Sequence, residues 1–166
     1  MLAKDAVVGA AVALARAVGT NGCVHSYDVR ADMQNTARHN LELIGLSQRV
    51  MLKTRDIADG FDETDAPALF LDVPNPWDYL AQTHRALRGG GFFGALLPTT
   101  NQVVLLLTGL QRHSFGMTEV VEVMLRNYKT VAARFRPSDR MVAHTGYLVF
   151  ARALNLEQPP MEPAST

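Results

Sequence analysis

Three short runs in the first half of the chain, each typical of a β-strand, lead into an aspartate. The runs and the acids that follow them are 23–27 with Asp28, 50–53 with Asp56, and 68–71 with Asp72. Segments with helical periodicity separate the runs, and strands that alternate with helices predict an α/β fold with a parallel sheet. Because ligands bind at the carboxyl ends of such strands, the three acids predict a binding site at one edge of the sheet.

The rest of the chain extends this pattern. The expected strands are 23–27, 50–53, 68–71, 92–97, 118–125 and 145–151, and the expected helices are 7–18, 31–43, 76–87 and 101–113. Gly19 is expected to cap the first helix. Only a loop joins the last two strands, which predicts an antiparallel ending. The triplet 89–91 is expected to be a flexible turn that enters a strand, so it is not a phosphate-binding loop.

The composition favours one globular domain without a global nucleic-acid signature. The 166 residues are 48% hydrophobic and carry 16 basic and 16 acidic side chains, so any RNA contact requires a local basic patch. The lone Cys23 excludes an intrachain disulfide; it is expected to be a small core residue, and a free thiol fits the reducing cytoplasm. We expect no membrane span, signal peptide or metal site, because the required runs and spacings are missing.

Two of the three aspartates have a functional and a structural interpretation. The Asp28 carboxylate can accept two hydrogen bonds from a ribose diol, or it can mark the entry to the helix that begins at Ala31. Asp56 can accept from the exocyclic amine of an adenine while Ile57 packs on the ring, or it can be a turn or cap residue. The residues by themselves leave both alternatives open.

Asp72 is the strongest catalytic candidate. It ends the buried run 68–71 and opens the segment Asp72-Val73-Pro74-Asn75-Pro76-Trp77. A carboxylate held between rigid prolines and an aromatic ring can bind a planar, nitrogen-rich group. Trp77 can stack on such a group or pack in the core.

A second candidate surface is the basic loop before the last strand. Its cations are Arg126, Lys129, Arg134, Arg136 and Arg140, and the aromatic residues Tyr128 and Phe135 are interleaved with them. This composition is typical of a phosphate-backbone contact, and equally of a solvated loop.

These segments together resemble the tRNA (adenine-58-N1) methyltransferase family of class I, S-adenosylmethionine-dependent enzymes. The matching segments are 14–19, 26–28, 55–56, 71–77, 87–91, 98–103, 136–137 and 141–148. The most specific are the proline-tryptophan segment, Pro98-Thr99-Thr100-Asn101-Gln102, and His144-Thr145-Gly146. Their combination and order indicate this family.

The resemblance implies a Rossmann-like sheet of seven strands with one antiparallel strand, and a tetramer that acts on tRNA in the cytoplasm. It implies that Asp28, Met33, Asp56, Ile57 and Asp72 bind S-adenosylmethionine and that Asp72 is catalytic. The residues expected to contact substrate are Trp77, Gln102, Arg136, His144 and Thr145. The implied reaction transfers a methyl group to N1 of adenosine 58 in the T-loop.

The chain departs from the family pattern at its amino terminus. The family carries a small amino-terminal β domain, a first strand and a glycine-rich loop, and only Gly9 can stand for that loop here. We expect a shortened methyltransferase domain over 1–153, largely without its first strand, and a disordered tail over 154–166. The alternatives are a non-catalytic tRNA-binding or scaffolding subunit, and a methyltransferase-like domain with another substrate.

Overall fold

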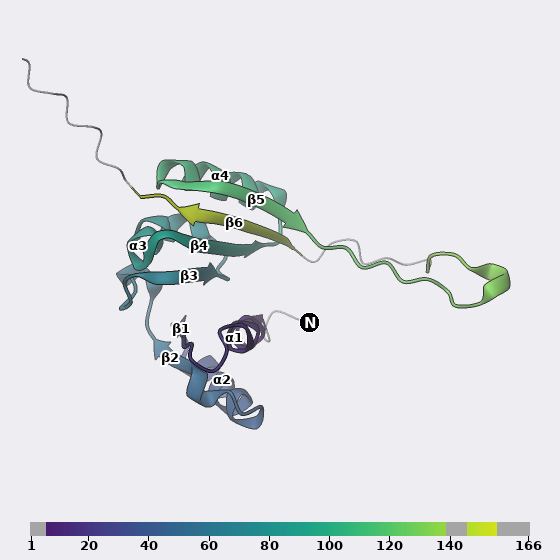
Figure 1. Cartoon of the computed structure of the whole chain (residues 1–166), viewed down its shortest axis with the longest axis horizontal. Coiled ribbons are helices and arrows are strands. Elements are labelled where there is room, and N and C mark those ends of the chain that lie inside the picture. The colour runs from purple at the N-terminus through teal and green to yellow at the C-terminus, as the bar shows by residue number, and fades with distance from the viewer. Residues whose placement is uncertain (1–5, 139–145, 156–166) are drawn as a thin grey trace, which may run out of the picture. The chain divides into compact units, whose positions relative to one another are not determined.

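The computed structural model describes residues 6–138 and 146–155 (Figure 1). The chain divides into two compact units, 1–61 and 62–166, and each is described by itself. The expectation of a single domain over 1–153 stays a prediction.

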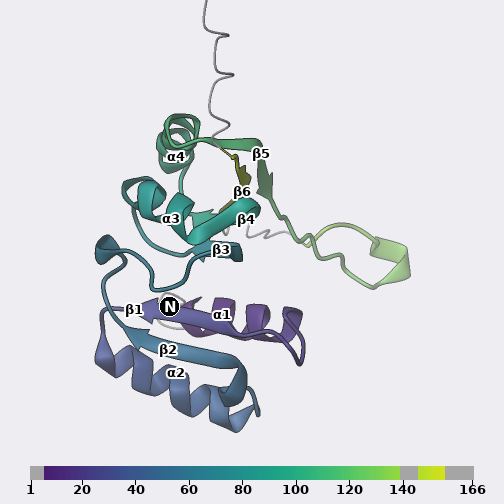
Figure 2. The same ribbon diagram turned by 60° about the vertical axis from the view of Figure 1, so that its left-hand side comes forward.

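The first unit is a two-stranded parallel sheet with two helices. Its elements are α1 (Ala6–Ala17), β1 (Val24–Asp28), α2 (Ala31–Leu43), η1 (Ser47–Arg49), β2 (Val50–Thr54) and η2 (Ile57–Asp59). Strands β1 and β2 pair in register from Val24 with Val50 to Asp28 with Thr54 (Figure 2). The core cluster of Ala15, Leu41, Leu46 and Val50 joins the helices to the sheet.

The expected helices and strands of this unit are confirmed, but one prediction of side-chain burial is wrong. Gly19 follows α1 with a φ of +70°, the left-handed conformation in which glycine ends a helix at no steric cost. Cys23 is exposed, so its prediction as a core residue is wrong: it directly precedes β1 and is not part of the strand. Within residues 6–61 the α-helices and strands follow the expected order, and the short turns η1 and η2 are additional.

The second unit is a four-stranded mixed sheet with helices on one face. Its elements are β3 (Ala66–Leu71), η3 (Pro76–Tyr79), α3 (Leu80–Ala86), β4 (Leu87–Leu97), α4 (Thr100–Arg112), β5 (Phe115–Glu122), η4 (Ala132–Arg134) and β6 (Tyr147–Ala153). The strand order is β3-β4-β6-β5. Strand β6 is antiparallel to both β4 and β5, whereas β3 and β4 are parallel. The expected antiparallel ending is therefore confirmed.

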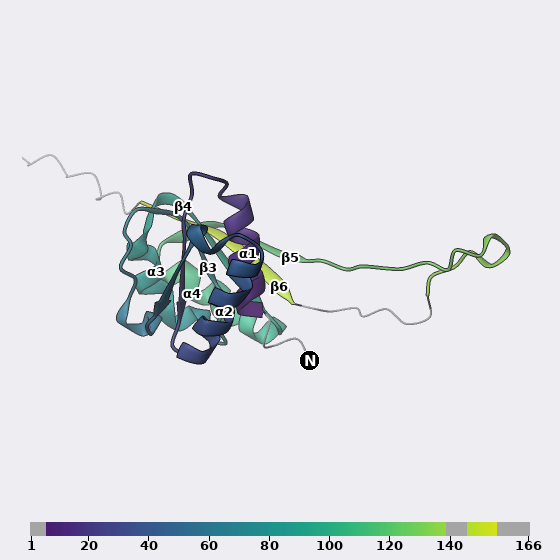
Figure 3. The same ribbon diagram turned by 90° about the horizontal axis from the view of Figure 1, so that it is seen from below.

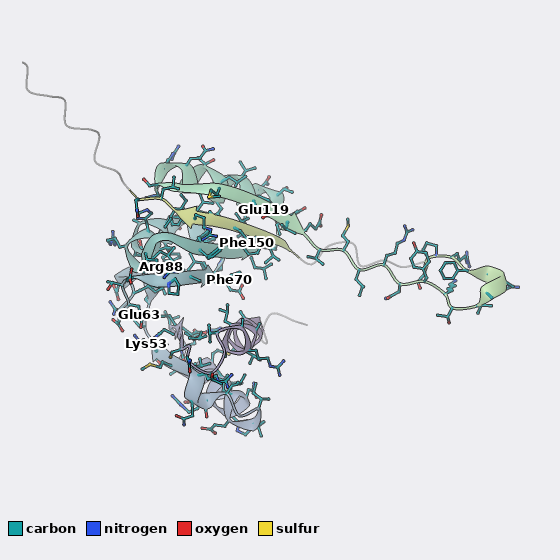
Figure 4. All side chains as sticks on the ribbon, viewed as in Figure 1. Lys53, Glu63, Phe70, Arg88, Glu119 and Phe150 are labelled. Carbon is teal, nitrogen blue, oxygen red and sulfur yellow. The ribbon has the colours of Figure 1, made fainter. Side chains whose placement is uncertain are left out.

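The two faces of this sheet are built differently. Phe93, Leu97 and Val149 are almost fully buried, together with Leu106 and Leu110 of α4. On the alternate positions Gly94 lies between Phe70 of β3 and Phe150 of β6, and a Cβ built on Gly94 would lie 2.6 Å from the Phe70 ring and 3.5 Å from the Phe150 ring. Glycine at this position lets two aromatic rings lie over the strand between them (Figure 4).

Several boundaries in this unit were predicted wrongly. The expected strands 118–125 and 145–151 are displaced, because Phe115 begins β5 by packing on Phe93 and His84, and β6 runs on to Ala153. The triplet 89–91 is part of β4, at an irregularity where the register with β3 jumps between Ala66 and Ala68. Leu154, predicted to begin the tail, donates a backbone hydrogen bond to Ser114 O at 2.8 Å; 156–166 lie outside the described residues.

Candidate active site

The carboxyl ends of β1 and β2 bring Asp28 and Asp56 to neighbouring positions. Arg55 N donates to Asp28 O at 3.2 Å, so the backbone next to Asp56 is tied to the end of β1. Asp28 and Met33, two of the predicted cofactor residues, line a small hollow of the first unit. The other lining residues are Ala11, Ser26, Gln34, Ala37 and Leu52.

The carboxylates of Asp28 and Asp56 share a local hydrogen-bond pattern. Arg30 N donates to Asp28 Oδ1 at 2.9 Å, and Ala58 N donates to Asp56 Oδ1 at 2.8 Å. Each acid therefore accepts from the backbone two residues further on, the arrangement known as an Asx turn. The Arg30 guanidinium adds contacts of 3.4 Å to both oxygens of Asp28. The helix-entry and capping interpretations hold for the free protein, and binding of cofactor by these residues remains a prediction.

Gln34 contributes a buried acceptor to the same hollow. Its side chain is 4% exposed, and its Nε2 donates to Lys53 O at 2.9 Å. Among the described residues its Oε1 has no hydrogen-bond partner. Because buried polar atoms are nearly always satisfied, this oxygen indicates that a donor can bind at the hollow. The sequence alone did not single out Gln34, whose place in the amphipathic α2 resembles that of any core-facing residue.

Asp72 follows β3 in the second unit and lies in a different electrostatic environment. Partial burial raises the pKa of the Asp72 carboxyl above that of an ordinary aspartate, because removing water disfavours the charged form. Asp72 cannot form an Asx turn, because the residue two positions further on is Pro74, which has no N–H. The position predicted from the sequence, a carboxylate at a strand end, is thus one where solvent is partly excluded.

The segment after Asp72 is held against α4. Pro76 begins η3 and is almost fully buried. A Cβ on Gly109 would lie 3.4 Å from Trp77 Cβ and 2.8 Å from Leu80, so the start of α3 packs closely on α4. Trp77 is half-buried at this contact. Its packing interpretation is supported, and its predicted stacking on a substrate base remains a prediction.

Gln102 meets this segment from the first turn of α4. Its Nε2 donates to Pro74 O at 3.0 Å, and its Oε1 accepts from Thr99 Oγ1 at 2.7 Å. Thr99 is also the N-cap of α4 and accepts from Gln102 N at 3.4 Å. Thr99 was not predicted as a site residue, although a threonine followed three residues later by glutamine is a recognisable helix-start signal.

Of the other predicted substrate residues, Arg136 is the one that lies in the described part of the chain. Arg136 is on the arm 123–138, which continues from β5 beyond the sheet (Figure 3). There Lys129 N donates to Arg136 O at 2.9 Å, and Tyr128 and Phe135 stack with ring centroids 5.3 Å apart and planes at 16°. His144 and Thr145 lie outside the described residues. Within the described chain there is no cluster of metal-binding side chains, and no helix there is long and apolar enough to cross a membrane.

Residues 7–139 match the model of the family described as the tRNA methyltransferase complex GCD14 subunit. The chain belongs to the GCD14 family. Among its relatives, the tRNA (adenine(57)-N(1)/adenine(58)-N(1))-methyltransferase TrmI of Methanocaldococcus jannaschii is 30% identical over 84% of this chain and 58% of its own length. TrmI of Thermus thermophilus is 30% identical over 87% of this chain and 57% of its own length. The chain thus spans little more than half of these relatives.

Two solved methyltransferase structures superpose on this GCD14 family member. A SAM-dependent O-methyltransferase of Thermotoga maritima superposes with a TM-score of 0.85 at 49% identity, over 89% of this chain and 56% of the other. The tRNA (m1A58) methyltransferase TrmI of Aquifex aeolicus superposes with a TM-score of 0.76 at 42% identity, over 85% and 57%. The chain therefore has the class I methyltransferase fold, as predicted.

The family and the fold imply S-adenosylmethionine as cofactor, and the first unit fits its nucleoside end. Two carboxylate oxygens on Asp28 can accept from a diol, and the unsatisfied Gln34 Oε1 can accept from a further donor. Gly9, the expected remnant of the glycine-rich loop, is inside α1, and a Cβ there would meet nothing within 4 Å. Gly9 is thus part of a helix and not of a glycine-rich loop.

Proposed function

We propose that this chain forms the catalytic part of a tRNA methyltransferase that transfers a methyl group from S-adenosylmethionine to N1 of adenosine 58. The proposal rests on Asp72, which directly follows β3 and lies within the matched family region. The carboxylate is partly desolvated, and its pKa is raised. Such perturbation at a strand end is typical of a catalytic group.

The first unit supplies the cofactor contacts in this proposal. Asp28 accepts from the ribose hydroxyls, and Asp56 accepts from the adenine amine. Met33 and Ile57 provide apolar surface for the adenine ring. The bonds that Asp28 and Asp56 accept from the backbone leave oxygen lone pairs for these contacts, because each carboxylate oxygen can accept more than one hydrogen bond.

The bound cofactor supplies an electrophilic sulfonium methyl group. Neutral adenine has a lone pair on N1, so no proton has to be removed before attack. Asp72 accepts a hydrogen bond from the exocyclic amine and orients N1 toward the methyl group. As the ring becomes cationic, the fixed carboxylate stabilises the developing charge, and its partial desolvation strengthens this interaction.

The arm 123–138 is the proposed contact with the tRNA backbone. It carries Arg126, Lys129, Arg134 and Arg136, and no acidic residue. The chain as a whole is neutral, so this segment concentrates positive charge where phosphates can be neutralised. Trp77, His144 and Thr145 complete the proposed substrate side, and Gln102 adjoins it through its hydrogen bond to Pro74 O. A tetramer in the cytoplasm is the assembly and location that we propose with this function.

The test is methylation of an unmodified tRNA transcript, followed by mass spectrometry of its nucleosides. We expect 1-methyladenosine from a transcript with adenosine at position 58 and none from a transcript with guanosine there. A methyl group at another position would contradict the specificity. Calorimetry with S-adenosylmethionine checks the donor side separately, because no binding at millimolar concentration excludes independent activity.

A non-catalytic subunit is the second candidate, and the helical position of Gly9 favours it. Such a subunit would bind tRNA in a salt-dependent manner and would neither bind the cofactor nor methylate. Tight tRNA binding with neither activity would replace the enzymatic proposal by this one.

A further inference from the structure

The segment between Asp72 and Trp77 has few backbone groups that can hold it in place. Pro74 and Pro76 have no N–H, so the ordinary donors of a turn are missing at two of its positions. Pro76 is buried and anchors the far end. The near end is β3, whose last residue Leu71 is also buried. Between these anchors the Pro74 carbonyl accepts a hydrogen bond from another element.

The element that reaches it is the first turn of α4. A carbonyl can only accept, so the amide nitrogen of Gln102 must face Pro74 O, as the 3.0 Å contact requires. This orientation leaves Gln102 Oε1 facing Thr99, whose hydroxyl hydrogen is committed to it at 2.7 Å. Each hydrogen-bonding role in the row Thr99–Gln102–Pro74 is thereby determined, and we call this row the Pro74 brace.

Thr99 does more in this row than cap a helix. Its capping contact with Gln102 N is long, at 3.4 Å, whereas its bond to the Gln102 side chain is short. In an ordinary capping box the side chain of the third helical residue turns back to the N-cap backbone. Here the Gln102 side chain extends across to the segment that follows Asp72.

We propose that Thr99 and Gln102 are positioning residues for Asp72, and that the Pro74 brace sets the place of its carboxylate for methyl transfer. The inference rests on the proposed role of Asp72 in that reaction. Gln102 then acts through Pro74 rather than by contacting the base. A misplacement of about 1 Å in a reacting group can lower the rate about a hundredfold, so a single lost bond in the brace is expected to matter.

The experiment compares three threonine substitutions in the full chain. Thr99→Val removes the hydroxyl at nearly constant volume, Thr99→Ser retains it, and Thr108→Val is the matched control. Thr108 is exposed on the same helix, and its hydroxyl donates only to Val104 O within that helix. Far-UV circular dichroism and Tm verify that each variant folds.

The first readout does not depend on activity. The chain has a single tryptophan, Trp77, which adjoins the braced segment. We expect Thr99→Val to change its emission and to increase acrylamide quenching, with Thr99→Ser and Thr108→Val like the wild type. Quenching in Thr99→Val equal to the wild type, in a folded protein, would overturn the brace whether or not the chain methylates tRNA. Gln102→Glu provides a second variant, because a carboxylate cannot donate to Pro74 O.

The second readout separates positioning from substrate contact. We expect Thr99→Val and Gln102→Glu to lower kcat about tenfold or more while KM for tRNA stays within about twofold, and Thr99→Ser to restore kcat. A raised KM with unchanged kcat would overturn the positioning role and assign Gln102 to the substrate. If the wild type does not methylate, the proposed function fails, and the fluorescence comparison still decides the brace.

Discussion

The aspartates at the ends of β1 and β2 differ in their hydrogen bonding from the aspartate at the end of β3. Asp28 and Asp56 each accept a hydrogen bond from the backbone two residues further on, at Arg30 and Ala58. Asp72 has Pro74 at that position, and burial raises its pKa. A strand-end aspartate forms a local Asx turn where the second following residue has an N–H, as at Asp28 and Asp56, and cannot form one where that residue is proline, as at Asp72.

The largest expected effect is at Asp72. In a form of the enzyme that methylates tRNA, Asp72→Ala should abolish transfer, with a loss of kcat of about a hundred- to a thousandfold, because a fixed charge near the reacting base is removed. Binding of S-adenosylmethionine, measured by calorimetry, should stay largely intact. Unchanged turnover would remove Asp72 from the mechanism and with it the contrast among the three acids.

The second effect is at Asp28. Asp28→Ala should weaken S-adenosylmethionine binding by about 1.5 to 3 kcal/mol, or about ten- to a hundredfold in Kd, because a charged acceptor is lost. At saturating cofactor kcat should change little, in contrast to Asp72→Ala. Calorimetry and saturation kinetics measure the two quantities. A large loss of kcat in Asp28→Ala with unchanged cofactor affinity would contradict the proposal that Asp28 binds the cofactor and only Asp72 is catalytic.

The third effect comes from a substitution that would give Asp72 the same local turn as Asp28 and Asp56. Pro74→Ala introduces an N–H two residues after Asp72, and a hydrogen bond to the carboxylate would lower the Asp72 pKa. We expect the acidic limb of the kcat profile to move to lower pH and kcat to fall about tenfold, since the carboxylate is drawn into a turn. Pro67→Ala, in an exposed position of β3, is the control for loss of a proline. A profile identical to the wild type would show that Pro74 does not keep Asp72 available.

The smallest effect is on stability. Since the folded pKa of Asp72 is raised, the folded protein binds more protons than the unfolded chain between the two pKa values, and its stability falls as pH rises through that window. Asp72→Asn removes this loss, so its Tm should exceed that of the wild type at pH 7. The advantage should vanish below about pH 4, where the aspartate is protonated in both states.

Thermal unfolding of the wild type and of Asp72→Asn, from about pH 4 to pH 7, tests the sign of this difference in Tm. Asp28→Asn should not produce the same gain, because it gives up the contacts of that carboxylate with Arg30. A lower Tm for Asp72→Asn at pH 7 would mean that the folded protein stabilises the charged form of Asp72.

The sequence predicted the order of the elements well and their ends less well. Alternation of apolar runs and helical segments identified all six described strands, because burial against helices leaves a clear pattern. The end of β5 was missed because apolar residues continue from β5 into the arm, where no local signal marks the change. The triplet 89–91 was taken for a turn, since glycine favours both turns and strand irregularities.

In the candidate site, too, some residues were predicted from the sequence and others were missed. Asp28, Asp56 and Asp72 were predicted from their places at strand ends, and the chemistry of their neighbours was readable, including the proline after Asp72. Gln34 and Thr99 were missed. Their importance depends on which atoms they meet across the fold, at Lys53 for Gln34 and at Gln102 for Thr99.

The sequence by itself determined the class I fold, the family and the three strand-end acids, because these depend on local periodicity and on residues that lie close together in the chain. Only the tertiary structure decided which acid is desolvated and how Gln102 directs its amide. The amide direction depends on α4 meeting the segment after β3, a contact between residues 28 positions apart. Burial and hydrogen-bond direction arise from such packing, and spacing along the chain does not encode them.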